Sequence, residues 1–134
     1  MKLRGWLVAF AALVATCVYA HGQSKKEIYE LQERCGKRAA EVFEKDFPKN
    51  ERKGLEVYEN HYSVRLNKCF LLEDNTTYLK VEGKTTTSKI LFLIDVNDNK
   101  VYGRFLDAFN CEVQEKPCSS EQEFRALIRP YMED

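Results

Sequence analysis

The chain has 134 residues, with 21 Lys and Arg against 21 Asp and Glu, so its formal net charge at pH 7 is zero. Without the first 20 residues, 19 basic and 21 acidic residues remain, which is a net charge of −2. This balance, with no cluster of Lys and Arg, argues against nucleic acid and against an anionic membrane surface as partners, because both require a concentrated basic face.

Residues 1–20 have the three-part pattern of a secretory signal peptide. Two basic residues precede an apolar run over 6–18, and Val18-Tyr19-Ala20 is a small-residue cleavage pattern before His21. The apolar run is shorter than the roughly 20 residues needed to cross a bilayer, which favours cleavage over a membrane anchor. A bacterial lipoprotein is the alternative, because the segment that ends at Cys17 resembles a lipobox. We therefore predict a signal peptide over 1–20 and a single secreted or periplasmic domain over 21–134.

Four cysteines remain in that domain: Cys35, Cys69, Cys111 and Cys118. An even number of cysteines in an oxidising compartment favours structural disulfides. Cys111 and Cys118 are close in sequence across a proline turn and are natural partners, which leaves Cys35 to pair with Cys69. Four cysteines allow three connectivities, so the other two stay open. A zinc site is disfavoured because no Cys-x-x-Cys spacing exists, and we expect no metal or cofactor.

The first predicted element is a helix that begins with a capping box of Ser24 and Glu27. Apolar residues then recur at three- and four-residue steps and form one stripe, which is typical of an amphipathic helix. The stripe consists of Ile28, Leu31, Cys35, Ala39, Val42 and Phe43. We expect the helix to end at Phe47-Pro48, since the residue before proline is pushed out of the α region.

Alternation from Tyr58 to Leu66 then predicts a half-buried strand. Simple alternation would point Cys69 away from Cys35 on the helix, so a bulge or turn at Asn67-Lys68 is expected to re-aim it. Residues 74–76 and 82–88 are polar and are predicted to be loops that flank a short strand over 78–81.

The remaining segments predict more sheet and a second helix. The apolar run 90–94 indicates a central strand covered on both faces, followed by a turn at 97–100 and a partner strand over 101–106. Another short strand is expected at 111–113. Ser120 and Glu123 then form a second capping box before a helix whose apolar face holds Phe124, Leu127, Ile128 and Tyr131, with Pro130 disrupting the last turn.

The order of these elements predicts an α+β fold. An N-terminal amphipathic helix packs on an antiparallel meander of about four or five strands, followed by a short C-terminal helix, with two disulfides. Cystatin-like folds have a comparable helix-on-sheet shape, but an analogy of fold carries no function.

The segment 95–100 resembles the opening of an EF-hand loop, with Asp95, Asn97 and Asn99 at its first, third and fifth positions. Lys100 replaces the required glycine and Leu106 lies where the bidentate glutamate belongs. Both flanks are predicted strands, so we interpret the segment as a hairpin turn rather than a metal site.

Other candidate residues have simpler interpretations. His61 is the only histidine inside the predicted domain and is interpreted as a surface or cross-strand contact, because neither a free thiol nor a serine triad can be recognised. Asn75-Thr76-Thr77 is a glycosylation sequon that matters only in a eukaryotic host. The aromatic residues Tyr58, Tyr62, Phe70 and Tyr102 could form a recognition surface, but aromatic side chains on strands favour a core.

Two segments together resemble a family of small uncharacterised exported bacterial proteins. These are His61-Tyr62-x-x-x-Leu66-Asn67-Lys68-Cys69-Phe70 and the later Cys118-x-Ser120-x-x-Glu123-Phe124-x-x-Leu127-x-x-x-Tyr131-Met132. The resemblance implies export and a compact fold but supplies no activity and no site residues.

We therefore expect a non-enzymatic binding module whose partner is a protein or small ligand of the envelope. A structural or stress-response envelope component and a small hydrolase are the alternatives. A concave pocket containing His61 with a perturbed carboxylate would favour the hydrolase, whereas a broad exposed apolar patch would favour binding.

Overall fold

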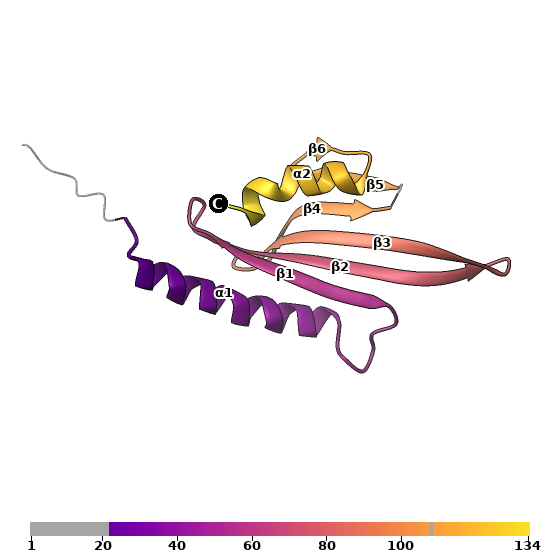
Figure 1. Cartoon of the computed structure of the whole chain (residues 1–134), viewed down its shortest axis with the longest axis horizontal. Helices are drawn as coiled ribbons and strands as arrows, with labels where there is room; N and C mark the ends of the chain where they lie inside the picture. The colour runs from indigo at the N-terminus through magenta and orange to yellow at the C-terminus, as the bar shows by residue number, and fades with distance from the viewer. Residues whose placement is uncertain (1–21, 108) are drawn as a thin grey trace, which may run out of the picture.

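The computed structural model describes residues 22–107 and 109–134. Its elements, in chain order, are α1 (Lys25–Asp46), β1 (Leu55–Ser63), β2 (Lys68–Val81), β3 (Lys84–Asp95), β4 (Lys100–Leu106), β5 (Asn110–Val113), β6 (Lys116–Pro117) and α2 (Glu121–Met132). The six strands form one antiparallel sheet in sequence order (Figure 1). The predicted α+β meander between two helices is confirmed, with the two-residue β6 as an additional strand. The expected signal peptide, Cys17 and His21 lie outside the described residues.

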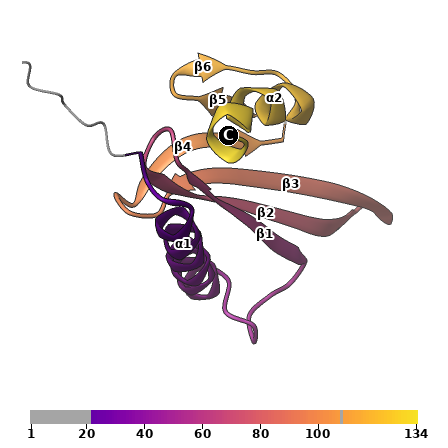
Figure 2. The same ribbon diagram turned by 60° about the vertical axis from the view of Figure 1, so that its left-hand side comes forward.

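The two helices lie on opposite faces of the sheet (Figure 2). α1 packs on β1 and β2 around a core of Cys35, Ala39, Tyr62, Cys69, Leu71, Ile94 and Val96. α2 contacts β1, β4 and β5 on the other face, around a core of Phe70, Leu72, Leu91, Leu93, Phe105, Val113, Phe124 and Ile128. Because successive strand residues point to opposite faces, β2 supplies side chains to both cores.

α1 has the ends that the sequence predicts. The hydroxyl of Ser24 accepts from the Glu27 amide at 3.2 Å, and the Glu27 carboxylate accepts from the Ser24 amide at 2.7 Å, which completes the capping box. The helix ends at Asp46, with Phe47 as its C-cap before Pro48.

α2 departs from the prediction at both ends. Ser120 accepts from the Glu123 amide, but the Glu123 carboxylate accepts from the Ser119 amide at 2.6 Å instead of closing on Ser120. The predicted capping box is therefore only half formed. α2 also continues through Pro130 to Met132, because a proline near the end of a helix removes only one intrahelical hydrogen bond.

The structure contains the disulfides Cys35–Cys69 and Cys111–Cys118. The turn that orients Cys69 covers residues 64–67, with Asn67 at φ 52°, so β1 ends earlier than the predicted strand. Cys69 pairs directly with Tyr62 across the β1–β2 hairpin. Directly paired residues share a face of the sheet, so Cys69 faces α1 and its Cα lies 5.4 Å from that of Cys35.

The prediction of loops at 74–76 and 82–88 is wrong. β2 and β3 pair continuously from Phe70↔Asp95 to Val81↔Lys84, and the turn consists of Glu82 and Gly83 alone. Both turn residues have positive φ, 51° and 79°, as a type I′ hairpin requires. The polar residues here reflect exposure rather than a loop, since this hairpin extends beyond the rest of the sheet (Figure 1). We call residues 77–88 the arm.

The apolar run on β3 is covered unevenly. Leu91 and Leu93 are fully buried under α2, whereas Ile90 and Phe92, on the opposite face, are half-buried. The prediction that this strand is covered on both faces is therefore wrong for part of its length, because α1 lies over β1 and β2 and not over β4.

Candidate binding surface

The face of β3, β4 and β5 that turns away from α2 is partly open. The strand register aligns Phe92, Arg104 and Glu112 in one row across the three strands. A hollow of about 300 Å³ lies against these side chains and Val101, which is 51% exposed. We call Phe92, Val101, Arg104 and Glu112 the open sheet face.

A β-bulge places Val101 on this face. The register shifts between Leu93↔Gly103 and Ile94↔Val101, so Tyr102 is an extra residue in β4. The Tyr102 ring turns to the α2 side and meets Phe70 edge-on at a centroid distance of 5.1 Å. Val101 is thereby left beside Phe92 as an apolar floor. The bulge hides this floor from sequence patterns, although period-two alternation along β3 places Phe92 on the face opposite the buried leucines.

Charged groups border the apolar floor. Arg104 Nε lies 2.7 Å from Glu112 Oε1, and both side chains are substantially exposed. Lys100 also lines the hollow, although its ammonium contacts the Tyr102 ring on the α2 side, 5.6 Å from the ring centroid. An apolar floor with a few polar groups at its edge is the usual composition of a binding surface.

His61 lies on the other face of the sheet, in a cluster with Ser63 and Asp134. One Asp134 oxygen contacts His61 Nε2, and the other accepts from Ser63 Oγ at 2.8 Å and from the Arg65 amide at 3.1 Å. The aspartate therefore sits between the serine and the histidine. A catalytic triad needs the histidine between the other two, so this cluster cannot activate Ser63 as in that mechanism.

This cluster holds the end of the described chain against the β1–β2 hairpin. Burial would raise the pKa of the Asp134 carboxyl, but hydrogen bonds from His61, the Arg65 amide and Ser63 outweigh it and lower the pKa to about 2. Arg65 Nη2 also donates to the Pro130 carbonyl at 2.7 Å, which ties α2 to the same turn. His61 is thus a half-buried contact between β1 and the C-terminal segment, and not a contact between neighbouring strands.

The segment that resembles an EF-hand forms the β3–β4 turn. Asp95 is fully buried, and its Oδ1 accepts from the Asn97 amide at 3.0 Å and the Asp98 amide at 3.3 Å. The Lys68 ammonium contacts both Asp95 and Asp98. These bonds make an Asx turn that neutralises its own carboxylates, as expected for a hairpin turn. Among residues 22–107 and 109–134, no group of three His, Cys, Asp or Glu side chains is placed to hold a metal ion.

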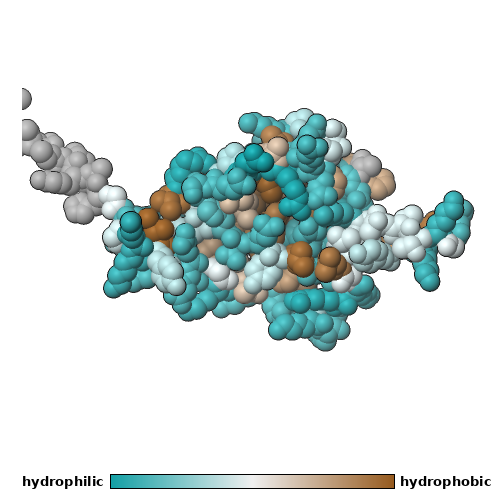
Figure 3. All heavy atoms as spheres, viewed as in Figure 1, coloured by the Kyte–Doolittle hydropathy of each residue, from teal (hydrophilic) through white to brown (hydrophobic). Residues whose placement is uncertain are grey.

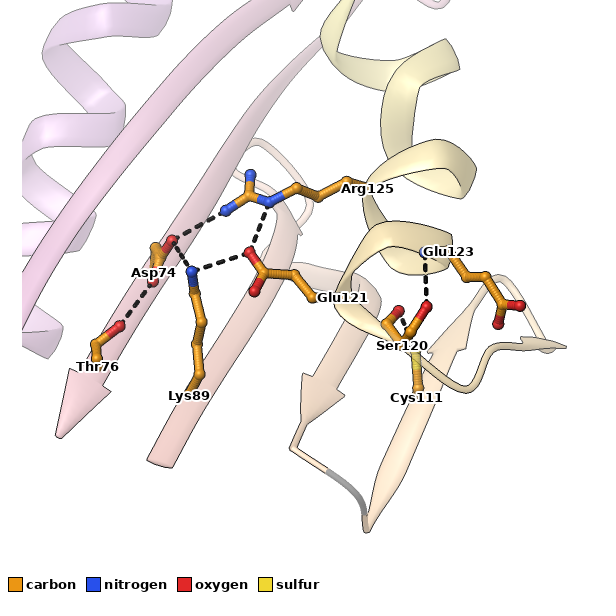
Figure 4. Close-up of polar contacts among 8 residues, drawn as sticks. All are labelled: Asp74, Thr76, Lys89, Cys111, Ser120, Glu121, Glu123 and Arg125. Carbon is orange, nitrogen blue, oxygen red and sulfur yellow. Dashed lines mark hydrogen bonds and ion pairs between the residues drawn. The ribbon is translucent and has the colours of Figure 1, made fainter. Parts of the chain in front are cut away.

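Four charged side chains join α2 to the sheet, which sequence reasoning did not find (Figure 4). Lys89 Nζ lies 3.3 Å from Asp74 and 2.9 Å from Glu121, and Arg125 contacts the same two carboxylates at 3.0 and 2.8 Å. Each carboxylate therefore lies between two cations. The network stabilises the docking of α2 on β2 and β3 and leaves no unpaired charge for a ligand.

One carboxyl group lies in the core beneath α1. Glu73 on β2 is 4% exposed, and its Oε1 has no hydrogen-bond partner within the described residues. Burial and the neighbouring Asp46 carboxylate of α1 raise the pKa of Glu73 to about 7. No pattern in the sequence singles out this buried acid, whose pKa depends on the tertiary fold.

The remaining candidate residues are distributed over both cores. Tyr62 faces α1 and Phe70 faces α2, and both are buried, so the four aromatic residues do not form one recognition surface. The sequon residue Asn75 is half-buried in the middle of the sheet, where it pairs with Glu56 and Ile90. It lies on a strand and not on the surface loop predicted there.

No protein-family model, curated protein or solved structure matches the chain.

Proposed function

We propose that the protein is a non-enzymatic binding module of the secreted or periplasmic space, and that the open sheet face contacts its partner. The observation that carries the proposal is the apolar floor of Phe92 and Val101 on a sheet whose opposite face is closed by α2. Exposed apolar side chains that line a hollow mark interaction sites more often than isolated exposed ones do.

One further observation supports the compartment. The two disulfides suit an oxidising environment. No helix in the described part of the chain is long and apolar enough to cross a bilayer.

The test is capture of the natural partner with matched variants. The protein expressed from its full chain is immobilised and exposed to the secreted or periplasmic extract of its source, and the retained proteins or ligands are quantified by mass spectrometry. Val101→Glu places a charge on the apolar floor. Val64→Glu is the matched control, because Val64 is also an exposed valine, 40% accessible, but lies in the β1–β2 turn.

The unmodified protein and Val64→Glu should retain the same partner, and Val101→Glu should retain at least about tenfold less, because the charge must be desolvated on binding. Thermal melts of both variants show that each is folded. Equal retention by Val101→Glu would place binding elsewhere, and recovery of no partner would argue against a binding module. A hydrolytic activity that is lost in His61→Ala would favour the hydrolase instead.

A further inference from the structure

Both edges of the arm lack a neighbouring strand within the described residues. β1 pairs with β2 only as far as Thr76, and β4 pairs with β3 only from Ile90 onward. Figure 3 shows the arm projecting from the body of the molecule. Tyr78 is 61% exposed, Leu79 48% and Val81 53%. An isolated two-stranded hairpin is at best marginally stable in water, and independent stability needs at least a third strand, so a further strand would stabilise the arm.

The two edges of the arm differ in accessibility and in the side chains that they carry. At the β3 edge, the Asp107 carboxylate accepts from the Lys89 amide at 2.8 Å and from Ser88 Oγ at 2.7 Å. The β3 edge is therefore blocked at its base, and its free part consists of Lys84 and three threonines. The β2 edge carries the apolar residues of the arm. We propose that two copies of this chain associate through the β2 edges of their arms, antiparallel, to form a four-stranded sheet. This association is independent of the open sheet face.

The backbone sets which residues can pair. Val81 and Lys84 close the two-residue turn, and the closing pair of such a hairpin exchanges its hydrogen bonds across β2 and β3. By the alternation of antiparallel ladders, Tyr78 and Lys80 then direct their N–H and C=O groups to the free edge. Among the described residues, no other element donates to or accepts from these groups.

One register uses both residues. A two-fold axis at Leu79 places Tyr78 of each copy opposite Lys80 of the other. This register gives two hydrogen-bonded residue pairs. An axis at Lys80 would place two lysines opposite each other, and like charges in directly opposed positions are destabilising. An axis at Tyr78 would require Thr76, which already pairs with Leu55 in β1.

The side chains are self-complementary in this register. Leu79 lies opposite Leu79 of the second copy, and Thr77 lies opposite Val81. Each Lys80 ammonium lies beside a Tyr78 ring, where a cation–π contact is favourable. The arm edge therefore brings apolar groups together with no like-charge pair.

Sedimentation of the full chain from about 10 μM to about 1 mM tests the association, since a short interface of this kind is weak. We expect a reversible monomer–dimer equilibrium. Leu79→Lys places two lysines on the axis and should weaken the dimer at least about tenfold. Thr86→Lys is the matched control: Thr86 is the cross-strand partner of Leu79 on the same face of the arm, but it lies at the β3 edge and should leave the dimer intact. Thermal melts show that both variants are folded.

Cross-linking tests the register separately. Leu79→Cys should form an intermolecular disulfide on mild oxidation, because opposed residues of a non-hydrogen-bonded pair have Cα atoms about 4.5 Å apart. Thr86→Cys should not. A protein that is monomeric at about 1 mM, a dimer unaffected by Leu79→Lys, or cross-linking through Thr86→Cys would each overturn the proposal.

Discussion

Glu73→Gln should remove a pH-dependent penalty on folding. The pKa of Glu73 is about 7 in the folded protein against a usual value of 4.5, so the folded state binds a proton that the unfolded state releases. The penalty is absent below pH 4.5 and grows as the pH rises through 7. Once Glu73 is ionised in the folded protein, a pKa shift of this size lowers the free energy of unfolding by roughly 3 kcal/mol. The amide of Gln does not titrate. At pH 8 the free energy of unfolding of Glu73→Gln should therefore exceed that of the unmodified protein by up to about 3 kcal/mol, which raises the melting temperature by roughly 10 °C.

Urea or thermal unfolding from pH 4.5 to 8.5 measures this difference. Glu59→Gln is the control, because Glu59 is an exposed glutamate on the adjacent strand β1. Asp46→Asn should reduce the pH dependence without abolishing it, since burial is the larger cause of the pKa shift. If the free energies of unfolding of Glu73→Gln and the unmodified protein changed in parallel with pH, Glu73 would not have a raised pKa in the folded protein.

Three further perturbations have expected outcomes. Replacing Cys35 and Cys69 by alanine should lower the free energy of unfolding by about 4 kcal/mol in the chain-entropy model, because the bond joins residues 34 apart in sequence; a loss under about 1 kcal/mol in chemical denaturation would contradict that model. Asp134→Ala should cost about 1 kcal/mol at pH 7, because solvent screens the contacts of this exposed residue; since the pKa of its carboxyl is about 2 in place of 3.8, the difference in stability from the unmodified protein should diminish as the pH falls through this window. Gly54→Ala should lower the melting temperature, because a Cβ there would lie 2.3 Å from the Thr76 carbonyl oxygen; an unchanged melting curve would show that β1 can shift at this point.

Local sequence signals predicted the helices and the disulfides well. Ser24 and Glu27 cap α1 by contacts within one turn, and Pro48 ends it through the backbone of the preceding residue, so both ends depend only on neighbours in sequence. The pairing of Cys35 with Cys69 followed by elimination, and the turn needed to orient Cys69 was expected close to where it lies.

The arm and the open sheet face were not predictable in the same way. The threonines of the arm favour strands, but the arm has no buried face, so its hydropathy shows no alternation that would mark β2 and β3 there. The raised pKa of Glu73 depends on burial beneath α1 and on Asp46, which is distant in sequence. The position of Val101 depends on a bulge, and nothing in the alternation of β4 marks Tyr102 as the extra residue.

Strand β2 is shared by both halves of the molecule. Residues 69–73 are buried without interruption, with Cys69 and Leu71 beneath α1 and Phe70 and Leu72 beneath α2. Detachment of either helix would expose one side of the strand on which the other helix depends. The two layers should therefore unfold as one cooperative unit, and the amides of residues 69–73 should exchange with solvent only through global unfolding.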